Sequence, residues 1–329
     1  METNAGWRPT ASHDVLKLRA SVLSRIRSFF ASQDVLEVDT PALSHAASTD
    51  PALASFRTSY SGPGAADSER CYLHTSPEFP MKRLLAAGSG SIYQLCKVFR
   101  DGERGARHNP EFTLLEWYRV GYDHLDLMDE VERLVTTVLS DIMPVSSVHH
   151  WCYRDLFMEM AGVDPFVADV QTLAGVLQSG HDITVVGLAD ADRDAWLDLI
   201  MTHIIEPRLG EGLVFIRDYP ASQAALARLR SGNPQVASRF EVYLNGMELA
   251  NGFHELSDAT EQAQRFIREQ ARRRAAGSEA VAIDDHLLSA VQAGLPDCGG
   301  GALGVDRLLM CACGARHIQE VIAFPFEVA

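Results

Sequence analysis

Charged and aromatic residues able to bind a phosphorylated ligand are concentrated between Phe99 and Tyr118, in FRDGERGARHNPEFTLLEWY. Side chains alternate along a strand, so Phe112, Glu116 and Tyr118 are expected to share one face. Guanidinium groups such as that of Arg100 bind phosphate in a forked geometry, and an aromatic ring can stack on a planar base. The segment predicts a hairpin that could bind a nucleoside triphosphate beside a cationic small molecule. A charged loop over a packed aromatic ring is the simpler alternative, which one hairpin does not exclude.

A second hairpin is predicted for FEVYLNGMELANGF, because Asn-Gly is a preferred two-residue turn. With that turn, Glu241 and Glu248 lie diagonally on one face, where two carboxylates repel each other unless a cation lies between them. Oxygen ligands of this kind suit Mg²⁺ bound together with substrate phosphates. Glu255 has the opposite parity, so it can join them only if the chain bulges, for which Gly252 is the expected place. Taken alone, the pair favours the simpler alternative of a solvated acidic face.

The third stretch is glycine-rich, GGGALGVDRLL at residues 299–309, and it lacks the pattern of a P-loop. It predicts a strand that turns into a helix near Asp306, with Arg307 in the first helical turn. A helix N-terminus favours anions, and Arg307 would add a full positive charge there. The alternative is a helix capped by Asp306 with an exposed arginine.

The net charge of −15 argues against nucleic acid as the default partner, and the hydrophobic content of 47% allows a sizeable core. The six cysteines show no paired zinc spacing and are expected to be buried thiols. No signal peptide or membrane-length apolar stretch occurs, so we expect a cytoplasmic protein. The basic run Arg272–Arg274 is either a solvated helix face, which is the favoured alternative, or a docking patch for an acidic partner.

The predicted elements combine antiparallel hairpins with grouped helices, which indicates an α+β fold: an antiparallel β-sheet flanked by helices. Helices are expected at 12–31, 80–88, 123–139 and 259–276. In addition to the hairpins, a short strand that Pro41 closes is expected in VLEVDTPAL, a strand that ends in a turn at 71–79, and a strand at 213–220. Residues 140–215 carry no usable motif.

Together these stretches resemble the catalytic domain of class II aminoacyl-tRNA synthetases. VLEVDTPAL is similar to the first motif of that class, the Phe99–Tyr118 hairpin to the second and GGGALGVDRLL to the third. RHNPEFTLLEWY and MELANGFHEL resemble lysyl-tRNA synthetases. TSPEFPMKRLL, PASQAALA and GLPDCGGGALGVDRL resemble the stand-alone ligases that attach β-lysine to a lysine of translation elongation factor P.

The resemblance implies a single catalytic domain over residues 1–329 and a homodimer built through the first motif. The helix of that motif begins by about residue 12, so no room is expected for an anticodon-binding barrel. Together with the net charge, this implies an acceptor other than tRNA, namely elongation factor P. The implied small molecules are ATP, Mg²⁺ and (R)-β-lysine or lysine.

The resemblance also implies residue roles. Arg100 and Arg307 would be catalytic, since they would clamp the ATP phosphates where charge develops. Residues implied to bind ATP are Arg100, Glu103, His108, Asn109, Phe112, Glu248, Leu249, Gly304 and Arg307. Residues implied to bind the amino acid are Ser76, Pro77, Glu78, Glu116, Tyr118, Asn251, Glu255 and Ala302. The implied metal ligands are Glu241 and Glu248.

Two positions and one segment depart from the lysyl-tRNA synthetase pattern. Gly102 replaces a glutamate, whose contact on the adenine side Glu103 is expected to take over. Ala302 replaces a glycine, and we hypothesise that its methyl group shifts preference from α-lysine toward β-lysine. The sequence AALA at residues 224–227 replaces Ser-Pro-Leu-Ala, a further sign of an altered pocket.

The implied reaction joins the amino acid to AMP with release of pyrophosphate, then transfers it to a lysine ε-amine of the acceptor. One alternative is a truncated lysyl-tRNA synthetase-like or amide-forming ligase with another acceptor. Another is a non-catalytic regulatory paralogue, against which the intact set of Arg100, Glu241, Glu248 and Arg307 argues.

Overall fold

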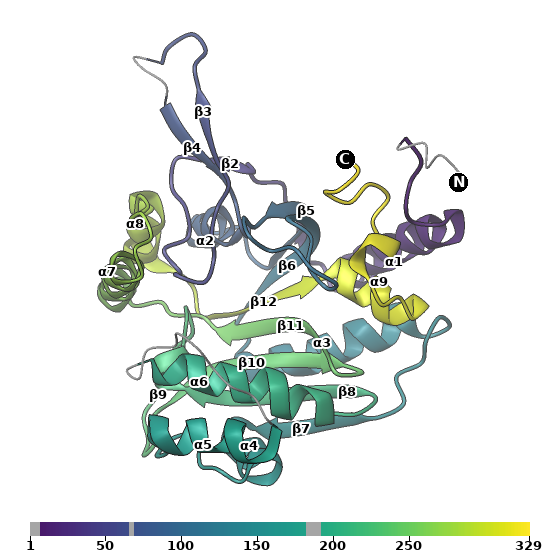
Figure 1. Cartoon of the computed structure of the whole chain (residues 1–329). Coiled ribbons are helices and arrows are strands. Elements are labelled where there is room, and N and C mark those ends of the chain that lie inside the picture. Colours follow the sequence, from purple (N-terminus) through teal and green to yellow (C-terminus); the bar gives the residue numbers. More distant parts are fainter. Residues whose placement is uncertain (1–6, 66–68, 182–191) are drawn as a thin grey trace. The chain divides into compact units, whose positions relative to one another are not determined.

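The computed structural model describes residues 7–65, 69–181 and 192–329, and its chain divides into two compact units (Figure 1). Unit 1 comprises Met1–Gly121 and Leu256–Ala329, and unit 2 comprises Tyr122–Glu255. Each unit is described by itself below. The single catalytic domain expected over residues 1–329 stays a prediction.

Unit 1 contains a four-strand sheet in the order β1-β5-β6-β12 and a smaller sheet in the order β2-β4-β3. The strands are β1 (Leu36–Glu37), β2 (Leu43–Ser44), β3 (Arg57–Tyr60), β4 (Glu69–Leu73), β5 (Ile92–Phe99), β6 (Glu111–Val120) and β12 (Cys298–Gly304). The helices are α1 (His13–Ala31), α2 (Glu78–Ala86), α7 (Ala259–Ala275), α8 (Asp285–Gly294) and α9 (Val305–Cys313). Strands β5, β6 and β12 pair antiparallel, whereas β1 runs parallel to β5.

Side chains of β6 alternate between two faces of the sheet: one face packs into the core, and the other carries the residues predicted to bind substrate, and is called the functional face below. Phe30 of α1 stacks on Tyr93 with ring centroids 4.6 Å apart and contacts Trp117 of β6, so Trp117 faces the helix. The odd-numbered residues of β6 therefore build the core beneath α1 and α9. Phe112, Glu116 and the other even-numbered residues lie on the opposite face, as the sequence predicts.

Unit 2 contains strands in the order β11-β10-β8-β7, with the short β9 beside β10. Its strands are β7 (Val148–Cys152), β8 (Leu213–Pro220), β9 (Leu229–Arg230), β10 (Val236–Leu244) and β11 (Met247–His254). Its helices are α3 (His124–Leu139), α4 (Tyr153–Ala161), α5 (Val170–His181) and α6 (Arg193–Ile200). A core that includes Tyr153, Trp196 and Tyr243 joins α4, α5 and α6 to one face of the strands. Asn245 and Gly246 both have positive φ, of 53° and 73°, as a type I′ turn between β10 and β11 requires.

The expected α+β class is confirmed, with parallel pairs only at β1–β5 and β7–β8 among the described strands. The short strand expected before Pro41 is confirmed as β1, which ends at Glu37, and a second short strand, β2, begins after Pro41, which lacks an amide donor. The strand predicted in residues 71–79 ends at Leu73 and is followed by a loop.

In the described ranges no helix is long and apolar enough to cross a membrane. All six cysteines are free thiols, but only Cys71 and Cys298 are buried: Cys96, Cys152 and Cys311 are partly buried and Cys313 is exposed.

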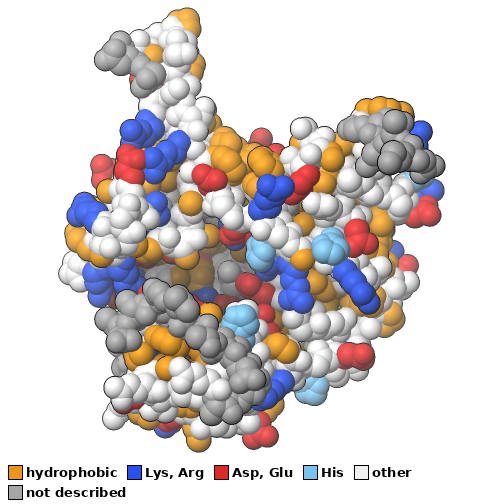
Figure 2. Space-filling view, in the orientation of Figure 1, with side chains coloured by type: hydrophobic (Ala, Val, Ile, Leu, Met, Phe, Trp, Pro, Cys, Tyr) orange, Lys and Arg blue, Asp and Glu red, His pale blue; other side chains and the backbone are white. Residues whose placement is uncertain are grey.

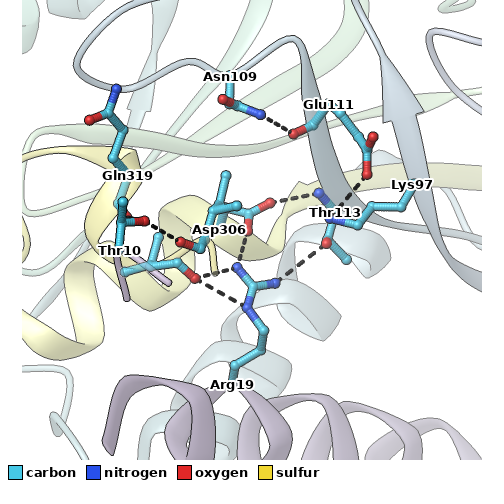
Figure 3. A network of polar contacts seen from close by, with 10 residues as sticks. Thr10, Arg19, Lys97, Asn109, Glu111, Thr113, Asp306 and Gln319 are labelled. Carbon is cyan, nitrogen blue, oxygen red and sulfur yellow. Dashed lines mark hydrogen bonds and ion pairs between the residues drawn. The ribbon is translucent and has the colours of Figure 1, made fainter. Parts of the chain in front are cut away.

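Asp306 is not the cap of α9 but a buried anchor beneath it (Figure 3). Its carboxylate forms an ion pair with Arg19 of α1 and accepts the backbone N–H of Thr113 in β6 at 2.6 Å. Arg19 also donates to the carbonyl of Val321 at 2.8 Å. Gly304 takes the position before the helix. One carboxylate thus joins α1, β6 and α9, the elements of the three sequence motifs.

The substitution Asp306→Ala is expected to lower the free energy of unfolding by about 3–5 kcal/mol, because it leaves the mostly buried Arg19 without its counter-charge. Urea unfolding followed by circular dichroism measures this loss. The control Arg27→Met removes an exposed pair of the same helix with Glu37 and should cost at most about 1 kcal/mol. A loss at Asp306 no larger than the control would show that the carboxylate is not the anchor.

Candidate active site

Glu116 is the centre of a hydrogen-bonded cluster on the functional face of unit 1. Its side chain is buried, and the hydroxyls of Ser76 and Tyr118 donate to its two oxygens at 2.6 and 2.8 Å. Ser76 Oγ also accepts the backbone N–H of Glu78 at 3.0 Å at the start of α2, beside Pro77. The structure therefore brings these predicted residues together. Each carboxylate oxygen has further lone pairs, so Glu116 can also accept from a ligand ammonium.

Glu78 has an internal partner that the sequence analysis missed. The ammonium of Lys82 donates to Glu78 Oε1 at 2.6 Å, and Lys82 is only 1% exposed. The signal was present, since Glu78 and Lys82 are four residues apart in a predicted helix. A ligand amine that binds Glu78 would therefore share this carboxylate with a resident lysine.

Ala302 lies directly opposite Glu116 in the β6–β12 pairing. Residues paired across antiparallel strands point to the same face, so the methyl group of Ala302 stands beside the Glu116 carboxylate. Its neighbours on this face of β12 are Gly300 and Gly304, opposite Tyr118 and Leu114. Ala302 is thus the one side chain that β12 contributes between two glycines. Gly304 has an ordinary φ of −75°, so glycine supplies space there rather than backbone freedom.

Arg100 is held at the edge of the same face. Its Nη1 lies 3.4 Å from Glu103 Oε1, and its Nε donates to the carbonyl of Thr75 at 3.3 Å. Its guanidinium carbon lies 5.0 Å from the ring centroid of Phe112. Arg100, Glu103 and Phe112 are therefore neighbours, as expected. Glu103 directly follows Gly102, whose φ of 87° suits glycine.

Arg307 lies at the start of α9 and contacts the hairpin loop. Its Nη2 donates to His108 Nε2 at 2.7 Å, which requires a neutral imidazole with its proton on Nδ1. Partial burial, followed by the charge of Arg307, lowers the pKa of His108 below its usual value. Arg307 and His108, which were predicted separately from two motifs, are thus hydrogen-bonded to each other.

Asn109 has a structural role in the same loop. Its side chain is buried, donates to the carbonyl of Glu111 at 2.6 Å and accepts the N–H of Phe326 at 3.1 Å. It thereby ties the C-terminal segment to the hairpin. Its predicted contact with ATP stays a prediction.

The carboxylates of unit 2 lie on one face of the β10–β11 hairpin. Tyr243 opposes Glu248, and Glu241 opposes Asn251, so the four side chains share a face. Glu241 accepts from Arg239 Nη2 at 2.5 Å and from the Tyr243 hydroxyl at 2.8 Å. Burial, together with the Glu241 carboxylate, raises the pKa of Tyr243, which keeps this hydroxyl protonated as a donor.

A β-bulge in β11 changes the face of the strand to which the residues leading to Glu255 point. The pairing jumps from Tyr243–Glu248 to Val242–Ala250 and leaves Leu249 out of register. The extra residue shifts the alternation by one, so Asn251 and the odd-numbered positions toward Glu255 share the face of Glu248. The bulge was expected at Gly252, which is wrong, since Gly252 pairs regularly with Phe240. The Leu249 side chain is buried, so only its backbone could contact a nucleotide.

The carboxylate pair fits a magnesium ion better than a metal held by protein alone. Across residues 7–65, 69–181 and 192–329, no group of three or more His, Cys, Asp or Glu side chains could hold a metal. Mg²⁺ takes one or two carboxylates and completes its shell with water and substrate phosphates. Glu241 and Glu248 would supply such a donor set. Arg239 already gives Glu241 a positively charged partner, so Mg²⁺ at this pair stays a prediction.

The segment at residues 224–227 has a backbone that the synthetase pattern excludes. Ala225 has a φ of 47°, whereas proline, the residue of the synthetase pattern at this position, is fixed near −65°. The segment leads to Ala227, which bridges to Glu255. The departure noted in the sequence is therefore a change of backbone conformation next to a predicted site residue.

Comparison with known proteins shows the family. The family model for class II tRNA synthetases (D, K and N) matches residues 5–328. The chain therefore belongs to the class II tRNA synthetases, and a ligase of this class uses ATP. The chain is 50% identical to the elongation factor P–(R)-β-lysine ligase of Vibrio cholerae, over 99% of this chain and 100% of the relative. It is 49% identical to the ligase of the same name from Edwardsiella ictaluri and 48% to that from Salmonella arizonae, over the full length of both chains.

The Arg307–His108 contact predicts a response to pH. The pKa of His108 in the folded protein is lowered, so His108 is neutral and accepts from Arg307 at any pH above the usual pKa of about 6.5. The contact is lost when the pH falls through the lowered pKa, because the protonated ring can no longer accept. Arg307→Met should raise the pKa of His108 but leave it below normal, since burial persists. An NMR titration assigned with His108→Gln measures both values. An unchanged His108 pKa in Arg307→Met would contradict the contact.

Proposed function

We propose that this protein activates (R)-β-lysine with ATP and transfers it to the ε-amino group of a specific lysine on translation elongation factor P. The observation that carries the proposal is the Glu116 cluster. A buried carboxylate oriented by Ser76 and Tyr118 can bind a side-chain ammonium, and Ala302 stands opposite it where it can select the shape of the substrate. Relatives named for this reaction match the chain over its full length.

In the first step the amino-acid carboxylate attacks the α-phosphate of ATP, pyrophosphate leaves and an aminoacyl-adenylate forms. This chemistry needs positioning and charge neutralisation rather than covalent help from the protein. Arg100 and Arg307 supply the positive charge, and Phe112 supplies a ring for the adenine. Before ATP binds, Arg100 is balanced by Glu103 and Arg307 rests on His108, so both guanidiniums are kept in place by neighbours.

The amino acid is held by its amines and its carboxylate. Glu116 and Tyr118 of unit 1 bind the side-chain ammonium, while Glu78 faces the other amine. In unit 2, Glu255 and Asn251 keep the roles that the resemblance implies for them, which are contact with the ammonium and with the carboxylate. The amine of β-lysine lies one carbon further along the chain than that of α-lysine. The methyl group of Ala302 therefore favours the β-isomer by filling space that glycine would leave open.

Glu241 and Glu248 would hold Mg²⁺, which neutralises the charge of the ATP phosphates when it is bound. In the second step the acceptor lysine attacks the adenylate carbonyl, AMP leaves and an amide forms. A free lysine has a pKa of about 10.4. Partial desolvation at a docked surface lowers this pKa, so a larger share of the acceptor lysine is the neutral amine that can attack. We further propose that the protein works in the cytoplasm as a homodimer formed through the first motif, and that tRNA is not its acceptor.

ATP–pyrophosphate exchange that depends on the amino acid tests the first step. With purified protein and Mg²⁺, exchange is expected to be well above background with (R)-β-lysine and lower with its enantiomer, α-lysine, aspartate or asparagine. Glu116→Gln should reduce exchange by at least about tenfold, because one charge-assisted hydrogen bond to the ammonium is lost. Absence of exchange with every amino acid would favour the regulatory paralogue instead.

Ala302→Gly tests the selection of the substrate. The variant is expected to raise kcat/KM for α-lysine relative to (R)-β-lysine by about tenfold, since one methyl group changes discrimination by about 1–3 kcal/mol. Ala302→Ser, which keeps a small side chain, serves as the control and should keep the preference of the wild type. An unchanged ratio in Ala302→Gly would remove Ala302 as the selecting residue.

A further inference from the structure

Helix α7 carries an exposed basic face in a chain whose net charge is −15. The face consists of Arg268, Arg272, Arg274 and Ile267, all of them exposed, with Ile267 at 61%. Arg268 and Arg272 are four residues apart and form one row, while Ile267 and Arg274 are seven apart and form a second row about a third of a turn away, with the exposed Ala271 between the rows. Figure 2 shows blue side chains gathered over α7 and near the base of β3 and β4.

Among the described residues, the three arginines of this basic face form no ion pair at hydrogen-bonding distance. Arg268 donates to the carbonyl of Gln264 on the same helix, and the charge of Arg272 acts on the partly buried Glu269 carboxylate without a direct bond. By contrast, Arg265 on the same helix pairs with Glu261, and Arg57 and Arg70 both pair with Glu279. Exposed arginines beside an exposed isoleucine are a composition that suits a protein interface.

Arg273, the middle residue of the basic run, does not belong to this face. It is 5% exposed, and its guanidinium donates to the carbonyls of Asp50 at 2.9 Å and Glu279 at 3.2 Å. The idea that the whole run Arg272–Arg274 docks a partner is therefore corrected. Arg268, one turn earlier, takes the place of Arg273.

The opposite side of α7 is anchored next to the amino-acid end of the site. Phe266 packs against Phe79 of α2 with ring centroids 5.9 Å apart, and Phe79 directly follows Glu78. Thr49 donates to Glu269, which fixes the helix to the loop after β2. The basic face is thus about one helix diameter, roughly 10 Å, behind the start of α2. A partner docked on it would be close to the residues that hold the activated amino acid.

We propose that the basic face of α7 docks an acidic surface of the protein acceptor and so directs the target lysine to the adenylate. The inference rests on the proposed function, because it takes elongation factor P as the acceptor. A protein fits better than a nucleic acid, since the face has three charges on one helix, an exposed isoleucine and no aromatic side chain for base stacking. The arginines then act by attraction and orientation, not in the chemistry.

The test compares direct binding and catalysis in two matched double variants. Arg268→Glu/Arg272→Glu is expected to weaken binding of purified elongation factor P from the same organism by at least about tenfold at low salt, with a smaller effect as salt rises. The control Arg8→Glu/Arg316→Glu makes the same charge change at two exposed arginines elsewhere and should bind like the wild type. ATP–pyrophosphate exchange should be unchanged in both, since no acceptor takes part in that step.

Equal weakening in the control and the α7 variant would mean that net charge alone matters and would overturn the proposal. So would unchanged binding in the α7 variant, or a loss of lysine tRNA binding instead of elongation factor P binding. If the wild type shows no ATP–pyrophosphate exchange, the proposed reaction is contradicted. The comparison of elongation factor P binding between the variants tests the docking surface independently of that reaction. Arg268→Gln/Arg272→Gln should give an intermediate loss, which separates lost attraction from new repulsion.

Discussion

The buried carboxylate of Asp306 is the constraint on which the arrangement of unit 1 depends. It lies between Arg19 of α1 and the backbone of Thr113 in β6, and it precedes Arg307 at the start of α9. A carboxylate in this position is costly to bury unless its partners are in place, so each of the three elements fixes the others. The consequence reaches the functional face, because the register that places Thr113 on Asp306 also places Glu116 opposite Ala302 and sets Arg307 beside His108.

Several charged site residues carry their own counter-charges before any substrate binds. Glu78 is paired with Lys82, Arg100 with Glu103 and Glu241 with Arg239. Buried or partly buried charges need such partners. Within each unit, the charged residues proposed to bind substrate are therefore held in place by internal ion pairs.

Most of this arrangement could be predicted from sequence where the signal is local. Strand alternation gave the shared face of Phe112, Glu116 and Tyr118, and the Asn-Gly turn gave the pairing of Tyr243 with Glu248. Apart from the local pair of Glu78 and Lys82, the failures at the site concern contacts between distant segments or small register changes. No local pattern marks Asp306 as buried, because its partners Arg19 and Thr113 lie far away in the chain. The bulge at Leu249 leaves no signature in the sequence, and Lys82 was overlooked although its spacing from Glu78 was visible.

The central claim is that the activated amino acid goes to a protein lysine and not to tRNA. The most direct measurement incubates the enzyme with ATP, Mg²⁺ and (R)-β-lysine in the presence of both elongation factor P and lysine tRNA, then analyses the two acceptors by mass spectrometry. We predict one added β-lysyl group on a single lysine of elongation factor P and none on the tRNA. Aminoacylated tRNA with unmodified elongation factor P would contradict it.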